Sequence, residues 1–133
     1  NKPILVFNHG KMKRDFTYID DIVEGIFRCC YKPATKNDKF DSKQPDPSTS
    51  LAPHRIFNIG NSQSIELMHF IKVLEESLGK KAIKNYQPIQ PGDVQSTEAN
   101  TEALEQWIGF RPSTKIEDGV RKFVTWFKDF YGF

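Results

Sequence analysis

Short strand-like runs alternate with helix-like segments along this chain, and that alternation constrains the fold more than any other feature of the sequence. Residues 4–8 read Ile-Leu-Val-Phe-Asn, a β-branched and aromatic run that stops at a His-Gly pair and predicts a strand. Residues 14–18 predict a second short strand. From Asp20 the apolar residues recur at helical spacing, and the predicted helix should end before Pro33. A chain that changes period in this way favours the mixed α/β class.

After residue 54 the alternation continues with a strand, a helix, a strand and two helices. They are expected over residues 55–60, 64–78, 82–89, 100–109 and from 114 onward. Ser64 is the expected cap of its helix, Gly79 its expected stop, and Thr114 with Glu117 fits a capping box. The last helix carries an apolar stripe that we expect in the core, formed by Val120, Phe123, Val124, Phe127 and Phe130. The sequence therefore predicts an α/β fold with short strands, about four helices and no internal repeat.

Residues 34–54 interrupt this pattern with three prolines and many charged residues, which predicts a long surface loop. A loop of about twenty residues inside a compact domain is usually functional or mobile, and the alternative is a solvated insertion. With 133 residues the chain fits one domain. We therefore expect a single domain over residues 1–133, with a mobile loop over 34–54.

The composition excludes several classes of function. The net charge is +2 and the longest basic concentration is residues 11–14, which is too little for a nucleic-acid-binding patch. No run reaches the roughly 18 apolar residues that a membrane span needs. The chain begins with Asn1 rather than Met and shows no signal peptide, so we expect a piece of a longer, cytoplasmic protein.

The usual catalytic, cofactor and metal motifs are missing from the sequence. The eight glycines are dispersed, so no dinucleotide or phosphate loop is predicted. No two histidines have metal-ligand spacing, and no tyrosine is followed by a lysine four residues later. Cys29 and Cys30 are adjacent and too few for a zinc site; we interpret them as helix thiols in a reducing compartment, with a vicinal redox switch as the alternative. The residues thus predict no catalytic, cofactor or metal site within this chain.

Three segments nevertheless carry a family resemblance. Residues 14–25 read RDFTYIDDIVEG, residues 57–61 read FNIGN, and residues 87–94 read QPIQPGDV, followed by TEAN at 97–100. In this order and spacing they resemble the C-terminal part of the extended short-chain dehydrogenases/reductases, the NAD-dependent epimerase/dehydratase family. Within that family they are most similar to nucleotide-sugar epimerases of the UDP-glucuronate 4-epimerase type. The proline-rich insertion over 34–54 also resembles that subgroup.

The resemblance implies a longer protein whose two halves have different functions. In the family, an N-terminal Rossmann half holds NAD and the catalytic Tyr and Lys, and the C-terminal half binds the nucleotide-sugar. The chain then resembles the UDP-sugar-binding half of an NAD-dependent 4-epimerase, inactive alone, whose partners are its own Rossmann half and, in the intact enzyme, a second copy in a homodimer. The alternatives are a dehydratase, decarboxylase or reductase of the same family, and a stand-alone nucleotide-sugar-binding module.

Two charged residues match the family's substrate contacts. Arg14 matches the arginine that contacts the diphosphate, a role that suits the fork of donors on a guanidinium. Asp93 matches the acid that accepts hydrogen bonds from the ribose hydroxyls, as an acceptor-only carboxylate can. The alternatives are that Arg14 only pairs with Asp15 or Asp21 on the surface, and that Asp93 is simply a turn residue.

Two further matches are less direct. Phe7 lies on the strand whose backbone contacts the uracil in relatives. Gln90 stands where several relatives carry a second phosphate-binding arginine, so the diphosphate must depend on Arg14 or on residues elsewhere. Asp20 and Asp21 resemble a catalytic carboxylate pair, but we interpret them as acids that open a helix at its positive end.

Overall fold

The computed structural model describes residues 2–132. Its elements are β1 (Ile4–Val6), a 3₁₀ turn η1 (Phe7–Gly10), β2 (Lys13–Asp15), α1 (Ile19–Tyr31), β3 (Ser64–Glu66), α2 (Leu67–Leu78), β4 (Lys84–Tyr86), α3 (Glu102–Ile108) and α4 (Ile116–Tyr131). The predicted α/β class, with short strands and four α-helices among these residues, is confirmed. Gly79 and Gly109 end α2 and α3 in the left-handed conformation, as expected for helix stops.

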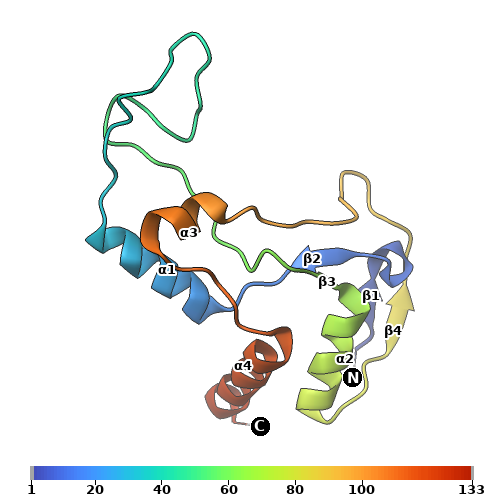
Figure 1. Cartoon of the computed structure of the whole chain (residues 1–133). Helices are drawn as coiled ribbons and strands as arrows, with labels where there is room; N and C mark the ends of the chain where they lie inside the picture. The colour runs from blue at the N-terminus through green and yellow to red at the C-terminus, as the bar shows by residue number, and fades with distance from the viewer. Residues whose placement is uncertain (1, 133) are drawn as a thin grey trace.

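The strands form two separate pairs. β1 and β4 run parallel, with Ile4 opposite Lys84, and β2 and β3 run antiparallel, with Arg14 opposite Ile65. Because β1 and β4 are parallel, the chain leaves both strands at the same end. Figure 1 shows these pairs on one side of the molecule and α1 with α3 on the other.

The main core lies between α2 and α4, which lie next to each other (Figure 1) and form the largest helix contact. Val73 of α2 and Val120 and Val124 of α4 are buried there, and partly buried side chains surround them. Gly119 lets α4 approach the segment before α1, because a Cβ at this position would lie 3.1 Å from the Tyr18 ring. This contact joins the two sides of the molecule.

The strand predicted over 55–60 is wrong, because only an isolated bridge between Thr49 and Arg55 forms there. A strand needs a neighbouring strand to satisfy its backbone groups. Beyond Ile56, whose amide donates to the Ser48 carbonyl at 3.0 Å, no strand within residues 2–132 pairs with this stretch. The first strand is also shorter than predicted and ends at Val6. Asn8 and His9 have φ values of 48° and 50°, and this left-handed backbone turns the chain out of the strand.

The predicted start of the second helix is wrong as well. Ser64 does not cap a helix but lies in β3, and α2 begins at Leu67. The ladder between β2 and β3 takes up residues 64–66, so the helix cannot begin until that pairing ends.

The predicted capping box at the start of α4 does not form, and no side chain caps this helix. The Asp21 carboxylate instead accepts hydrogen bonds from the Ser113 and Thr114 amides at 3.3 and 2.9 Å. Glu117 bonds to His69 of α2 at 2.9 Å, which takes its side chain away from the position that a capping box requires.

The apolar stripe of α4 is only half in the core. Val120 and Val124 are buried, whereas Phe123 and Phe130 are exposed. The prediction of a fully packed stripe is therefore wrong for the outer part, because α2 covers only one side of the stripe and the aromatic rings beyond it stack mainly on each other.

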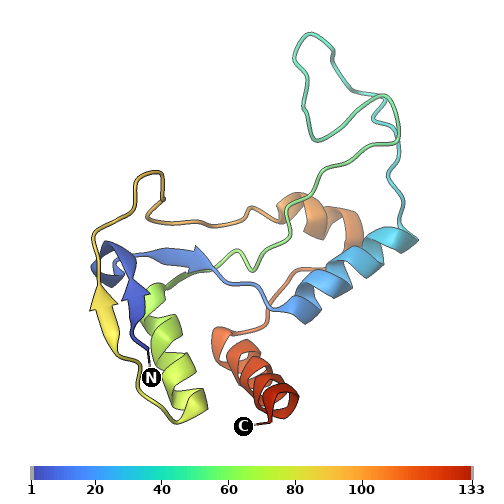
Figure 2. The same ribbon diagram turned by 180° about the vertical axis from the view of Figure 1, so that it is seen from behind.

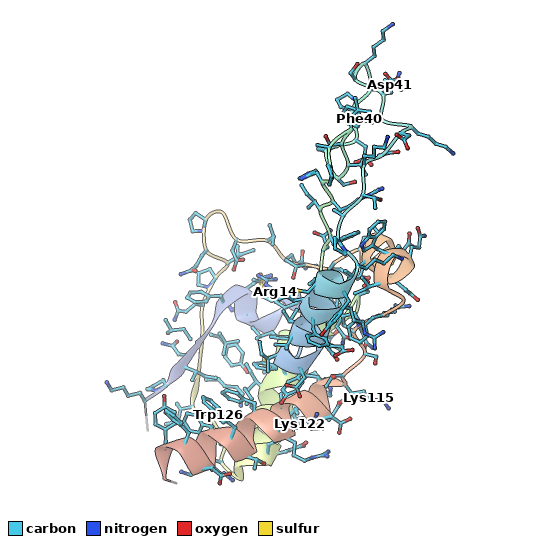
Figure 3. The ribbon with its side chains drawn as sticks, turned by 90° about the vertical axis from the view of Figure 1, so that its left-hand side faces the viewer. Arg14, Phe40, Asp41, Lys115, Lys122 and Trp126 are labelled. Atoms are coloured by element: carbon cyan, nitrogen blue, oxygen red, sulfur yellow. The ribbon has the colours of Figure 1, made fainter. Side chains whose placement is uncertain are left out.

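Residues 34–54 form turns without a helix or strand, apart from the single bridge of Thr49, as the predicted loop requires. The loop projects from the end of α1 away from the rest of the molecule (Figures 1 and 2). Figure 3 places its tip, marked by Phe40 and Asp41, far from Arg14. The loop therefore does not cover the region of Arg14 in this structure.

Candidate functional site

The two charged residues singled out from the sequence lie side by side. β2 presents Arg14, and its Nη2 donates to Oδ1 of Asp93 at 2.8 Å. Its Nη1 donates to the carbonyl oxygens of Lys13 and Gln95 at 2.8 and 3.3 Å. The guanidinium is therefore held in one orientation by an ion pair and two backbone oxygens. Arg14 forms no ion pair with Asp15 or Asp21, so the alternative that it pairs only with them is wrong.

Asp93 is held by the turn that precedes it. Residues 90–93 form a β-turn in which the Asp93 amide donates to the Gln90 carbonyl at 3.1 Å. Pro91 and Gly92 occupy the central positions, and Gly92 has a φ of 82°, which a type II turn requires and glycine adopts readily. The predicted Pro-Gly turn is confirmed. Because of it, Gln90 and Asp93 belong to one short rigid unit.

Arg14 and Asp93 each keep hydrogen-bonding capacity. Asp93 Oδ1 also accepts from the Val94 amide at 2.8 Å, but Oδ2 has no partner among residues 2–132. The Nε of Arg14 likewise has none within the described chain. The side chains are 27% and 30% exposed, so both can be reached from solvent. The pair therefore offers a guanidinium edge and a carboxylate oxygen next to each other, which suits a ligand carrying both an anion and hydroxyls.

Phe7 follows β1 and Gln90 lies beyond β4. Because these strands are parallel, both residues lie at the same end of the strand pair. Phe7 is half-buried in η1 immediately after β1, not in a strand as predicted, and the His9 amide donates to the Gln87 carbonyl at 2.9 Å. Gln90 lies three residues beyond Gln87 and is exposed. Ligand groups often lie beyond the carboxyl ends of parallel strands. The structure gives no direct contact from Phe7 to Arg14.

The loop that carries Asp93 is pinned along β2. Lys13 donates its amide to the Gln95 carbonyl at 2.9 Å, and its own carbonyl accepts from the Thr97 amide at 3.3 Å. A groove of about 420 Å³ lies beside this contact and is lined by Lys11 and Lys13, the lysines of the basic run noted in the sequence. Both side chains are exposed, and Lys13 lies 3.9 Å from Glu66.

The residue that sequence reasoning missed is Asp15, which appeared there only as a possible partner of Arg14. Its two carboxylate oxygens accept hydrogen bonds from the amides of Asn61, Ser62 and Ala99 at 3.0–3.1 Å. No spacing in the sequence indicates this arrangement, because the three amides come from segments about 46 and 84 residues away. The strand predicted over 14–18 gave no signal either, because β2 ends at Asp15 only in the structure.

The remaining titratable candidates do not form a reactive site. Asp20 and Asp21 lie in the first turn of α1, as predicted for acids at a helix start. Cys29 and Cys30 are both unpaired thiols. Burial, and secondarily the neighbouring Cys30, raises the pKa of Cys29 above its ordinary value, which disfavours the reactive thiolate.

Residues 2–132 offer neither a cluster of metal ligands nor a membrane-spanning helix. No group of three or more His, Cys, Asp or Glu side chains in this range is arranged to hold a metal ion. None of the helices in the same range has the length and apolar content needed to cross a membrane.

Known proteins resemble this chain over nearly all of its length. Residues 1–60 match the model of the NAD dependent epimerase/dehydratase family. Protein CapI of Staphylococcus aureus is 50% identical, over 98% of this chain and 39% of that protein. A probable UDP-glucuronate 4-epimerase of Rhizobium meliloti is 41% identical, over 98% of this chain and 38% of that protein. The chain thus spans less than two fifths of the length of these relatives.

A solved structure agrees with the sequence matches. The UDP-glucuronic acid 4-epimerase of Bacillus cereus, in complex with UDP-glucuronic acid and NAD, superposes with a TM-score of 0.72 and is 26% identical. The match covers 98% of this chain and 36% of that chain.

Proposed function

We propose that this chain, whose residues 1–60 match the model of the NAD dependent epimerase/dehydratase family, is the UDP-sugar-binding part of a longer nucleotide-sugar 4-epimerase. Its substrate is UDP-glucuronate. The support for this substrate is the resemblance to a probable UDP-glucuronate 4-epimerase and to a solved UDP-glucuronic acid 4-epimerase. Residues 1–133 form one substrate-binding domain, with the loop over 34–54 mobile.

The observation that carries the proposal is the contact between Arg14 and Asp93. The free guanidinium edge of Arg14 binds the diphosphate, and the free Oδ2 of Asp93 accepts from the ribose hydroxyls. The backbone at Phe7 contacts the uracil. Gln90 adds an amide donor without a positive charge, so Arg14 is the principal diphosphate ligand on this chain.

Hydride chemistry at C4 of the sugar is supplied by NAD, which the remainder of the longer protein holds. The dispersed glycines of this chain provide no dinucleotide loop, so its residues fit a substrate role and not a cofactor role. What this chain contributes is firm binding of the UDP moiety, which keeps the nucleotide in place while the sugar presents first one face and then the other.

The rest of the proposal concerns the intact protein. The intact protein is a cytoplasmic homodimer, and in each copy this domain packs against the Rossmann half of the same chain. Residues 1–133 alone are inactive. A dehydratase, decarboxylase or reductase of the same family is the alternative function, and the reaction product distinguishes them.

The test is to incubate the full-length protein with UDP-glucuronate and NAD and to identify the product by NMR. Epimerisation predicts a mixture of UDP-glucuronate and its C4 epimer, UDP-galacturonate, with no net change in NADH absorbance. Release of carbon dioxide, loss of water from the sugar or net consumption of NADH would contradict the proposal. The chain of residues 1–133 serves as the inactive control.

A further inference from the structure

The carboxylate of Asp15 joins three segments that are distant in the sequence. Oδ1 accepts from the Asn61 amide at 3.1 Å, and Oδ2 accepts from the Ser62 and Ala99 amides, both at 3.0 Å. The amide of Asp15 itself lies 3.5 Å from Oγ1 of Thr97. β2 is thereby tied to residues 61–62 and to the segment that follows Asp93. We call this arrangement the Asp15 clasp.

The clasp is tightly packed. A Cβ built on Gly60 would lie 2.5 Å from Cβ of Ala99 and 2.9 Å from Oδ2 of Asp15. Contacts this short do not occur, so the three segments meet this closely only because residue 60 is glycine. A single added methyl group would push residue 99 away from β2.

The clasp acts on the chain that carries Asp93. Successive side chains of a strand point to opposite faces, so Asp15 and Arg14 leave β2 in opposite directions. Arg14 holds the loop at Asp93 and Gln95. Asp15 holds the same loop at Ala99, six residues after Asp93. The loop is therefore anchored on β2 from both faces.

We propose that Asp15 is a positioning residue for nucleotide binding, because its contact with the Ala99 amide sets the spacing between Arg14 and Asp93. This inference rests on the proposed function, in which those two residues bind the diphosphate and the ribose. Asp15 touches no ligand in this role. It fixes the strand that presents the guanidinium relative to the loop that presents the carboxylate.

The chemistry requires a carboxylate at this position. Both oxygens of Asp15 accept from backbone amides, and an amide side chain offers only one acceptor oxygen. In Asp15→Asn the NH2 group faces at least one of the three backbone donors, so part of the clasp is lost. Asp15→Ala removes all of it.

A matched control is available in Asp21. Its carboxylate also accepts from two backbone amides of a distant segment, at Ser113 and Thr114, but it does not hold the loop that carries Asp93. Asp21→Ala therefore removes the same kind of bond elsewhere. We expect Asp15→Ala in the full-length protein to weaken UDP binding about tenfold, which is the size of the loss when one hydrogen bond from a displaced Arg14 or Asp93 to UDP is no longer made. Asp21→Ala should change it less than twofold.

The measurements are UDP affinity by isothermal titration calorimetry, the thermal unfolding temperature, and the KM and kcat for UDP-glucuronate. A positioning role predicts a raised KM with kcat within about twofold, and an intermediate KM for Asp15→Asn. Equal loss of thermal stability in Asp15→Ala and Asp21→Ala with unchanged UDP affinity in both would overturn the inference.

A second variant covers the case in which Asp15→Ala does not fold. Gly60→Ala keeps every charge and opens the clasp by steric pressure, so it should also weaken UDP binding, and adding Ala99→Gly should restore part of the affinity by removing the closer clash. Normal UDP affinity in a folded Gly60→Ala would contradict the inference. The proposed function is tested separately: if Arg14→Ala weakens UDP binding and the clasp variants do not, only the role of Asp15 fails.

Discussion

The region around α2 and α4 and the region around α1 differ in what covers their apolar side chains. Ile71 of α2 is 7% exposed, whereas Ile26 of α1 is 52% exposed. Both helices are amphipathic, so a periodic apolar face identifies a helix without saying what packs on it. In the proposed longer protein, we expect the exposed face of α1 to be covered by the part that lies outside this chain. The contact between α2 and α4 buries Val73, Val120 and Val124 within this chain, although Phe123 and Phe130 of α4 remain exposed.

The largest expected effect comes from truncating the same residue type in the two regions. Ile71→Ala should cost about 2–5 kcal/mol of unfolding free energy, as for other buried isoleucines. Ile26→Ala should cost less than about 0.5 kcal/mol in residues 1–133, because Ile26 is already 52% exposed and alanine favours a helix more than isoleucine does. Urea unfolding of both variants measures this, and equal costs would remove the distinction between the two regions.

The same pair of variants sharpens the comparison in the full-length protein. There the cost of Ile26→Ala should rise toward that of Ile71→Ala, because the proposed Rossmann half buries α1. An unchanged cost would show that α1 faces solvent in the intact protein too.

A pH effect should belong to the α2 region. Glu75 is buried at the end of α2, and bonding to the Lys84 ammonium, followed by the Ala82 amide, lowers its pKa from 4.5 to about 2. Because the pKa is depressed in the folded state, this contribution to stability is complete above pH 4.5 and is lost as the pH falls toward 2. Glu75→Gln should lower the free energy of unfolding at neutral pH. It should also reduce the further decrease in that free energy between pH 4.5 and 2.

The control for this effect is Glu24→Gln on α1. Glu24 forms a surface pair with Arg28 one turn later at 2.6 Å, and such pairs contribute only about 0.3–0.5 kcal/mol. Unfolding curves of both variants at several pH values compare the regions. Parallel acid dependence of Glu75→Gln and the unmodified protein would contradict the role given to Glu75.

A smaller effect than those of Ile71→Ala and Glu75→Gln is expected where the two regions meet. Lys122 of α4 reaches Asp20 at 3.7 Å and lies 5.0 Å from the centre of the Tyr18 ring, and Figure 3 shows its place on α4. Lys122→Ala should cost about 0.5–1 kcal/mol, the usual size of an exposed cation–π contact. Hydrogen exchange at residues 18–21 should increase in this variant. Unaltered exchange there would indicate that Lys122 does not help to join the two regions.

Local patterns in the sequence predicted most of the fold. Periodicity identified the helices, and the glycines at 79 and 109 marked two of their ends. The errors occurred where a tertiary contact overrides a local signal. Ser64 pairs with β2 instead of capping a helix, and Glu117 bonds to His69 instead of closing a capping box. Residues 55–60 read as a strand but, apart from the bridge at Arg55, have no neighbouring strand among the described residues 2–132.

In the candidate site too, the residues could be predicted from the sequence but their tertiary contacts could not. Arg14 and Asp93 were found by resemblance to a family motif, and the structure brings them within 2.8 Å of each other. Their mutual contact was not predicted, because 79 residues separate them and no local pattern encodes the pairing. Asp15 was missed for a similar reason, since its partners are backbone amides, which leave no trace in residue identity.

The most direct test of this account is the UDP affinity of the full-length protein and of its Arg14→Ala variant, measured by isothermal titration calorimetry. A hydrogen bond to a charged group contributes about 1.5–3 kcal/mol, which is about ten- to a hundredfold in affinity. We expect UDP to bind the unmodified protein and Arg14→Ala to weaken binding by that factor without lowering the NAD content. An affinity that stays the same in Arg14→Ala would show that this arginine does not bind the diphosphate.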